Sequence, residues 1–197
     1  MTLIPEIILD VSGNSLERTS WASGQALARY VLDHPDSVAG LNVIDFGTGG
    51  GQVAIAASIA GAAHVYALDI EPFGDAVQAN AAANGVTNVE FRQVDARYFH
   101  PDTDNISWDI LLAADVFYYR GVRRFLHSLD FGVRSAIIAD PGTRGAPPFT
   151  DRDTHPLRAY GNVKTIPAEM EEEDYKNTQV KLFNLGERLR GKGKGSR

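Results

Sequence analysis

The segment "VIDFGTGGGQ", residues 43–52, constrains the fold more than any other part of the sequence. An apolar run that contains one acid, Asp45, leads into four glycines within five residues. Glycine costs backbone entropy on folding, so it concentrates where the backbone turns sharply or presses against a ligand. Because the helical sequence "QVAIAASIAGA" follows directly, the segment predicts the ligand-binding turn between a strand and a helix of a doubly wound sheet.

Strand-like and helix-like segments alternate around this turn, which predicts a parallel α/β sheet with helices on both faces. The chain then ends on two strand-like segments that no long helix separates, so we expect them to pair antiparallel. Ser23 is expected to cap the first helix. The predicted strands are residues 41–46, 64–70, 89–95, 108–115, 134–140, 161–168 and 178–185, with a short one at 7–9, and the predicted helices are residues 23–34, 52–62, 74–85 and 121–129.

Length and composition predict one domain. The 197 residues, 44% of them hydrophobic, divide into an irregular segment 1–20, a domain over 21–185 and a tail over 186–197. This tail holds five of the 19 Lys and Arg and little apolar surface, so we expect it to be disordered. The net charge of -6 disfavours a nucleic-acid surface. Without a leader sequence or an apolar span for a membrane, we expect a cytoplasmic monomer.

Several site classes are disfavoured by residue type. The chain has no cysteine, which excludes a thiolate nucleophile or metal ligand, and its five histidines show no ligand spacing, so we expect no metal site. A phosphate-binding P-loop needs G-K-[ST] after the glycines, and none follows. A dehydrogenase G-x-G-x-x-G that starts at Gly47 would need its third glycine at Gln52, and one that starts at Gly49 begins two residues late.

The pattern that does fit is D-x-G-x-G-x-G, formed by Asp45, Gly47, Gly49 and Gly51. A carboxylate here suits a ligand with an amino group or a cationic centre and would repel a pyrophosphate. S-Adenosylmethionine carries an ammonium and a sulfonium and has no phosphate.

Two further acids end the next two predicted strands. Asp69 ends the second strand, where it can accept hydrogen bonds from both ribose hydroxyls, and Asp95 ends the third, where it can accept one from an adenine amine. Each acid alone could equally cap a loop, but three of them at consecutive strand ends favour a nucleoside site. The sequence here resembles the class I, seven-stranded S-adenosylmethionine-dependent methyltransferases over residues 20–185. This resemblance implies a Rossmann-like sheet whose last strand is antiparallel, with S-adenosylmethionine as cofactor.

The segment "ADVFYY", residues 114–119, follows the fourth predicted strand. It lacks the [DNS]-P-P-[YF] pattern of enzymes that methylate amides or base amino groups. An acid followed by aromatic rings suits an aliphatic amine instead, because the carboxylate orients the nitrogen and the rings surround its growing positive charge. Asp115, Phe117 and Tyr118 are therefore the candidate catalytic residues, although Phe117 could equally be a packing residue.

Four segments in order give a narrower resemblance. "WASGQALARYVLDHP", "ALDIEP", "ADVFYY" and "ADPG" are similar to the lysine methyltransferases that modify the β-subunit of electron transfer flavoprotein. In that family a W-x-x-G-Q segment, matched by Trp21, Gly24 and Gln25, helps to close the cofactor site. The cofactor-binding residues expected from pattern and resemblance together are Trp21, Gln25, Asp45, Gly47, Thr48, Gly49, Gly51, Asp69, Ile70, Asp95 and Ala96.

Three functions stay open on the sequence. The first is a protein lysine methyltransferase that acts on the electron transfer flavoprotein β-subunit or a similar protein with an exposed lysine. The second is a small-molecule N-methyltransferase on the same scaffold, which would need a closed pocket. The third is a non-catalytic S-adenosylmethionine-binding module, which the intact cofactor acids disfavour. Either Asp115 or water could accept the amine proton.

Overall fold

The computed structural model describes residues 7, 21–95, 97–101, 103–116, 135–140, 161–167 and 179–185, the last two ranges through their backbone. Phe117, Tyr118 and Ala96 lie outside these residues, as do the predicted helix over 121–129 and the tail over 186–197.

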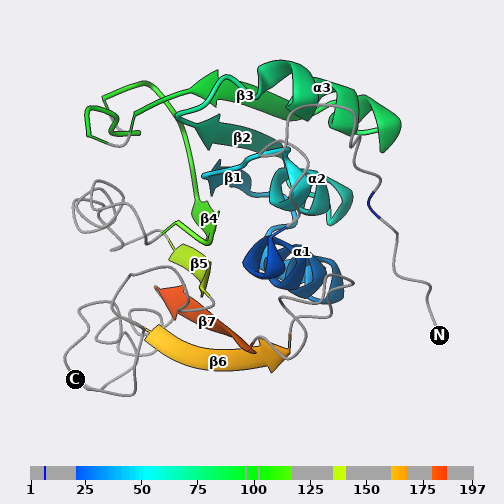
Figure 1. Ribbon diagram of the computed structural model, residues 1–197, viewed down its shortest axis with the longest axis vertical. Coiled ribbons are helices and arrows are strands. Elements are labelled where there is room, and N and C mark those ends of the chain that lie inside the picture. Colours follow the sequence, from blue (N-terminus) through cyan, green and yellow to red (C-terminus); the bar gives the residue numbers. More distant parts are fainter. Residues whose placement is uncertain are drawn as a thin grey trace, which may run out of the picture.

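The strands form one sheet in the order β3-β2-β1-β4-β5-β7-β6 (Figure 1). The first five strands are parallel to one another, which confirms the predicted Rossmann-like parallel sheet, and β7 runs antiparallel to both β5 and β6. The strand bounds are β1 (Asn42–Phe46), β2 (His64–Asp69), β3 (Val89–Gln93), β4 (Ile110–Ala114), β5 (Ser135–Asp140), β6 (Gly161–Pro167) and β7 (Gln179–Leu185).

The α-helices in the described part of the chain lie on one side of this sheet (Figure 1). They are α1 (Ala22–Asp33), α2 (Gln52–Ile59) and α3 (Gly74–Ala83), and a short 3-10 helix η1 (Pro35–Ser37) follows α1. The predicted cap at Ser23 is wrong. The helix starts earlier, with Trp21 at the N-cap position and its carbonyl accepting the Gln25 N–H at 3.0 Å, so Ser23 lies inside the first turn with a fully buried side chain.

Alternate strand residues build the core between the sheet and the helices. Val43, Val65 and Leu112 are fully buried and belong to one apolar cluster with residues of the helices, among them Leu27 of α1 and Val53 of α2. The buried face of α2 is mostly alanine, so this helix can lie close to both the sheet and α1. None of the helices in the described part of the chain combines the length and apolar character that crossing a membrane requires.

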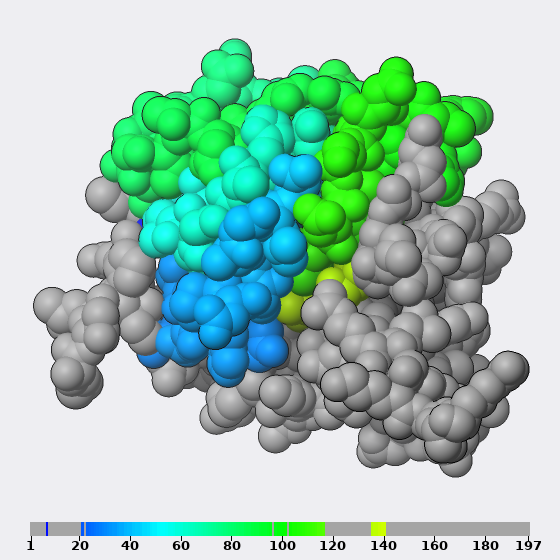
Figure 2. Space-filling view, turned by 180° about the vertical axis from the view of Figure 1, so that it is seen from behind, coloured from blue at the N-terminus to red at the C-terminus, as the bar shows by residue number. Residues whose placement is uncertain are grey.

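Strand register brings the carboxyl ends of the parallel strands together at one edge of the sheet. Phe46, the last residue of β1, pairs with Leu68 on one side and with Ala113 on the other. At the start of the same strands the Asn42 N–H donates to Asp109 Oδ2 at 2.8 Å, and Figure 2 shows the blue residues around β1 beside the green residues that lead into β4. Segments more than 60 residues apart in sequence are thereby fixed side by side.

We expect Leu112→Ala to lower the free energy of unfolding by about 2–5 kcal/mol, because Leu112 is fully buried in the central strand and alanine would leave a cavity. Tyr98→Ala is the matched control, since Tyr98 is 81% exposed and its loss should cost less than about 0.5 kcal/mol. Urea denaturation followed by circular dichroism measures both, and equal losses would contradict this packing.

Candidate functional site

The glycine loop connects β1 to α2 through backbone conformations that favour glycine. Gly47, Gly49 and Gly51 have φ values of +77°, +53° and +89°. These are the three glycines of the predicted D-x-G-x-G-x-G pattern. A Cβ on Gly47 would lie 2.6 Å from Val116 Cγ1, and a Cβ on Gly51 would lie 3.3 Å from Val77 Cγ1. The loop therefore needs glycine both for its conformation and for the close approach of its neighbours.

Hydrogen bonds fix this loop to the end of β2. The N–H groups of Gly47 and Thr48 both donate to the Leu68 carbonyl, at 2.8 and 3.0 Å, and the Gly49 N–H donates to Asp69 Oδ2 at 2.9 Å. The loop backbone is thus held against the neighbouring strand. Thr48 and Gly49 of the loop and Asp69 of β2, all three predicted to bind the cofactor, therefore lie together.

Asn80 is a loop-positioning residue that sequence reasoning missed. Its side chain is 1% exposed, and its Nδ2 donates to the Gly50 carbonyl at 2.8 Å, so α3 also holds the loop. The available signal was the spacing of Asn80 in "GDAVQANAAANG", because it lies three residues after the buried Val77 and so on the same face of the helix. A polar side chain on the buried face of a helix requires a partner, and here a loop carbonyl provides it.

Asp45 is the most deeply buried acid of the site, at 1% exposed. Its Oδ2 accepts the Thr48 hydroxyl at 2.6 Å and the Ala54 N–H of α2 at 3.0 Å. Burial away from water raises the pKa of Asp45 to about 7, the two hydrogen bonds oppose that shift, and the nearby Asp69 carboxylate adds to it. A desolvated carboxylate of this kind would be stabilised in its charged form by a cationic group close to it.

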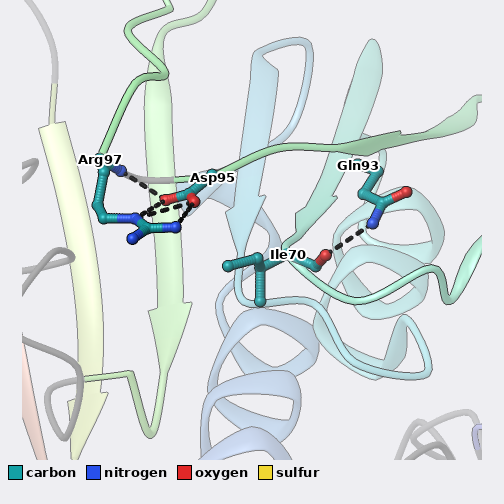
Figure 3. Close-up of polar contacts among 4 residues, drawn as sticks. All are labelled: Ile70, Gln93, Asp95 and Arg97. Carbon is teal, nitrogen blue, oxygen red and sulfur yellow. Dashed lines mark hydrogen bonds and ion pairs between the residues drawn. The ribbon is translucent and has the colours of Figure 1, made fainter.

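Asp69 and Ile70 lie at the end of β2. Asp69 is half-buried, and its two oxygens accept the backbone N–H groups of Gly49 and, at 3.1 Å, of Glu71. A carboxylate oxygen has room for a second hydrogen bond, so Asp69 can still accept from a ligand. Ile70 is 45% exposed although it is a large apolar residue, and its carbonyl accepts Gln93 Nε2 at 2.8 Å (Figure 3). An exposed apolar side chain beside a carboxylate suits a nucleoside, because the flat base can pack on the apolar side chain and the ribose hydroxyls can donate to the carboxylate.

Asp95 follows β3 and forms an ion pair with Arg97. The side-chain hydrogen bonds from Arg97 hold the pKa of Asp95 below its usual range, and the Arg97 backbone N–H contributes in the same direction. Sequence reasoning placed Asp95 in the site without this partner. Trp21 and Gln25 lie at the start of α1, beside the start of α2. A Cβ added to Gly24 would be in ordinary van der Waals contact, at 3.5 Å, with Oε1 of Gln52 in α2.

Asp115 lies directly after β4 on the other side of the glycine loop. It is 9% exposed and has a φ of +52°, which is uncommon for a residue with a side chain. Its N–H donates to the Ala139 carbonyl of β5 at 3.0 Å, and the next residue, Val116, is the one that would collide with a Cβ on Gly47. The structure therefore places Asp115 beside the loop that carries the predicted residues Gly47, Thr48, Gly49 and Gly51.

A cluster suited to a metal is not found in the part of the chain that the structure describes. The arrangement there is an edge of carboxylates at the ends of β1 to β5, with an exposed apolar residue at the end of β2.

We expect the stability of the protein to fall as the pH rises from about 4 to 7, because Asp45 is protonated in the folded protein and ionised in the unfolded chain over this range. The sign follows from the raised pKa, since the unfolded chain binds fewer protons. The loss from this group is on the order of 4 kcal/mol. Asp45→Asn should remove that part of the pH dependence, whereas the exposed Asp36→Asn should keep the wild-type slope. Urea midpoints at several pH values measure it, and parallel slopes for wild type and Asp45→Asn would contradict the assignment.

Comparison with known proteins gives consistent relatives. The profile of the lysine methyltransferase family matches residues 6–129. The electron transfer flavoprotein beta subunit lysine methyltransferase of Danio rerio is 33% identical over 165 residues, 79% of this chain and 60% of that protein. The Rattus norvegicus protein of the same name is 35% identical over 129 residues, 62% of this chain and 49% of that protein. The chain spans about half the length of the curated relatives it matches.

Solved structures agree at the level of the fold. A ribosomal protein L11 methylase from Lactobacillus delbrueckii subsp. bulgaricus has a TM-score of 0.56 and 20% identity, over 80% of this chain and 75% of that one. A Pyrococcus abyssi tRNA (uracil-54, C5)-methyltransferase in complex with S-adenosyl-L-homocysteine has a TM-score of 0.57 and 14% identity, over 82% of this chain and 38% of that one. With the profile match over more than half its length, the chain belongs to the lysine methyltransferase family.

Proposed function

We propose that the protein is an S-adenosylmethionine-dependent protein lysine N-methyltransferase. The observation that carries the proposal is the position of Asp115, a buried carboxylate whose neighbour Val116 packs against Gly47 of the glycine loop. An acid that can bind an amine thereby adjoins a loop suited to a nucleoside ligand. Membership of the lysine methyltransferase family supports the same reaction.

The residues of the site fit S-adenosylmethionine. The loop over residues 47–51 contains no lysine or arginine that would balance a pyrophosphate, and the buried Asp45 favours a cation nearby. Asp69 retains acceptor capacity for ribose hydroxyls, Ile70 offers an apolar surface to the adenine, and Asp95 lies at the next strand end. We propose that these residues, together with Thr48, Gly49 and Gly51, bind the cofactor. We propose that Trp21, Gln25 and Ala96 line the edge of the cofactor site. The relative from Pyrococcus abyssi holds S-adenosyl-L-homocysteine on the same fold.

When bound, S-adenosylmethionine supplies an activated methyl group to a nucleophile aligned with it. Asp115 accepts a hydrogen bond from the incoming amine and so directs the nitrogen toward the glycine loop. Alignment at a separation of roughly 3 Å can itself supply several kcal/mol of the rate enhancement. A lysine ammonium, with an ordinary pKa of about 10.4, must first lose a proton, which a partly desolvated site favours. Phe117 and Tyr118 follow Asp115 in sequence, and we propose that their rings line the path of the amine.

We infer that the substrate is the β-subunit of electron transfer flavoprotein or a protein similar to it. The support is the name shared by the relatives from Danio rerio and Rattus norvegicus. We also propose that the active enzyme has the seven-stranded sheet in which β7 lies antiparallel between β5 and β6. The monomeric state and the cytoplasmic location stay predictions.

We expect the purified protein to transfer label from S-adenosylmethionine to a protein band of a cell lysate, and to the purified flavoprotein β-subunit. Asp115→Asn should lower this turnover by about 10²-fold, the scale of one well-placed electrostatic contact, because it removes the charge and keeps the shape. Label that appears only in small molecules would support a small-molecule N-methyltransferase instead. Loss of cofactor binding in Asp115→Asn, with normal turnover at saturating cofactor, would place Asp115 in the cofactor site.

Asp69→Ala, in contrast to Asp115→Asn, should act mainly on the affinity for the cofactor. It removes a charged acceptor for the ribose, and such hydrogen bonds are worth about 1.5–3 kcal/mol each, so affinity for S-adenosylhomocysteine should fall by at least about tenfold. Calorimetric titration measures this loss. An unchanged affinity would show that Asp69 serves only the Gly49 N–H, and tight binding of NADH with none of the homocysteine compound would contradict the proposed cofactor.

A further inference from the structure

The carboxylate of Asp95 is engaged by Arg97 on both of its oxygens. Oδ1 accepts the Arg97 backbone N–H at 2.9 Å and Nε at 3.0 Å, while Oδ2 accepts the same Nε at 3.0 Å and Nη2 at 2.5 Å. Figure 3 shows the guanidinium folded back over the carboxylate, with Ile70 on the neighbouring strand end. Three N–H groups thus make four contacts, two to each oxygen, because the single Nε–H is shared between the oxygens.

Four is also the approximate number of acceptor positions on a carboxylate. The adenine amine of the proposed cofactor needs one of them. Asp95 can therefore accept from adenine only when Arg97 gives up at least one contact. The most readily released is the Nε–H, because it is shared between the two oxygens at 3.0 Å each.

The guanidinium can move without loosening Asp95. Without the side chain, the Arg97 backbone N–H would still donate to Oδ1. The N–H groups of Tyr98 and Phe99 donate to the Asp95 carbonyl at 2.9 Å each, so the backbone hydrogen bonds of the turn do not involve the Arg97 side chain. That side chain is 55% exposed, and its guanidinium carbon lies 5.3 Å from the centre of the exposed Tyr98 ring. An ion pair so open to water contributes little net stability, so a ligand can displace it.

We propose that Arg97 competes with the adenine amine for Asp95 and so weakens the binding of ligands that carry this amine. The inference rests on the proposed cofactor. A base with an N–H donor replaces the hydrogen bond that Asp95 loses when the guanidinium moves away. A base without a donor at that position leaves Arg97 bound to Asp95. Because only the amine-bearing base has to displace the guanidinium, Arg97 lowers the preference of Asp95 for that base.

The test compares two ligands on the full-length protein. S-Adenosylhomocysteine carries the adenine amine, and its 6-deamino purine analogue carries hydrogen in the same place. In Arg97→Met, which keeps a long apolar side chain and removes the guanidinium, the Kd for S-adenosylhomocysteine should fall about 2- to 5-fold, the range expected for a surface ion pair. The Kd for the analogue should not change. Arg97→Gln should lie between wild type and Arg97→Met.

Arg92→Met is the matched control. Arg92 pairs with Glu90 at 2.7 Å and lies 5.0 Å from the Tyr66 ring centre, so it has the same kind of partners on the strand itself and outside the proposed site. This variant should bind both ligands as wild type does. Calorimetry gives the affinities, and thermal melting of each variant verifies the fold.

The outcomes separate the two proposals. Weaker or unchanged binding of S-adenosylhomocysteine in Arg97→Met and Arg97→Gln, or an equal gain for both ligands, overturns the competition by Arg97 and leaves the cofactor intact. Failure of the wild-type protein to bind S-adenosylhomocysteine overturns the proposed cofactor and this inference with it. A selective gain for the amine-bearing ligand supports both.

Discussion

The buried carboxylate of Asp45 is the group on which the rest of the site depends. Through one oxygen it joins the loop, at the Thr48 hydroxyl, to the first turn of α2, at the Ala54 N–H. The glycines can then adopt their left-handed conformations, because the two ends of the turn are fixed. Removing a carboxylate from water is costly, and the pKa of about 7 for Asp45 expresses that cost. A structure retains such a group where its charge is used.

Strand order turns this local contact into a site with two sides. β1 lies between β2 and β4, so a loop that leaves β1 borders the end of β2 and the end of β4 at once. Asp69 and Ile70 come from the first neighbour, and Asp115 comes from the second. The tight contact between Gly47 and Val116 shows how closely the two sides meet. A nucleoside and an amine can therefore approach from opposite sides of the same glycine loop.

The sequence predicted those features that depend on one segment at a time. The five parallel strands, the glycine turn and the acids at strand ends follow from apolar runs and from residue types at fixed spacing. Partners distant in sequence were not predictable in this way, as Asn80 on the Gly50 carbonyl shows. Neither was the left-handed backbone of Asp115, which reflects its bond to β5. The misplaced cap at Ser23 has a related cause, since burial against neighbouring elements outweighed the local preference of serine for a helix start.

The acids of the site edge differ in how their charge is balanced. Asp45 is buried with hydrogen bonds but without a basic partner among the described residues, and the Asp69 carboxylate adds to its unfavourable charge. Asp95 is half-buried and balanced by Arg97. Positive charge on a ligand is therefore worth most near Asp45 and least near Asp95, where a neutral N–H donor suffices. In the proposed complex this charge distribution would favour the ammonium and sulfonium of S-adenosylmethionine on the Asp45 side of the edge and the neutral adenine on the Asp95 side.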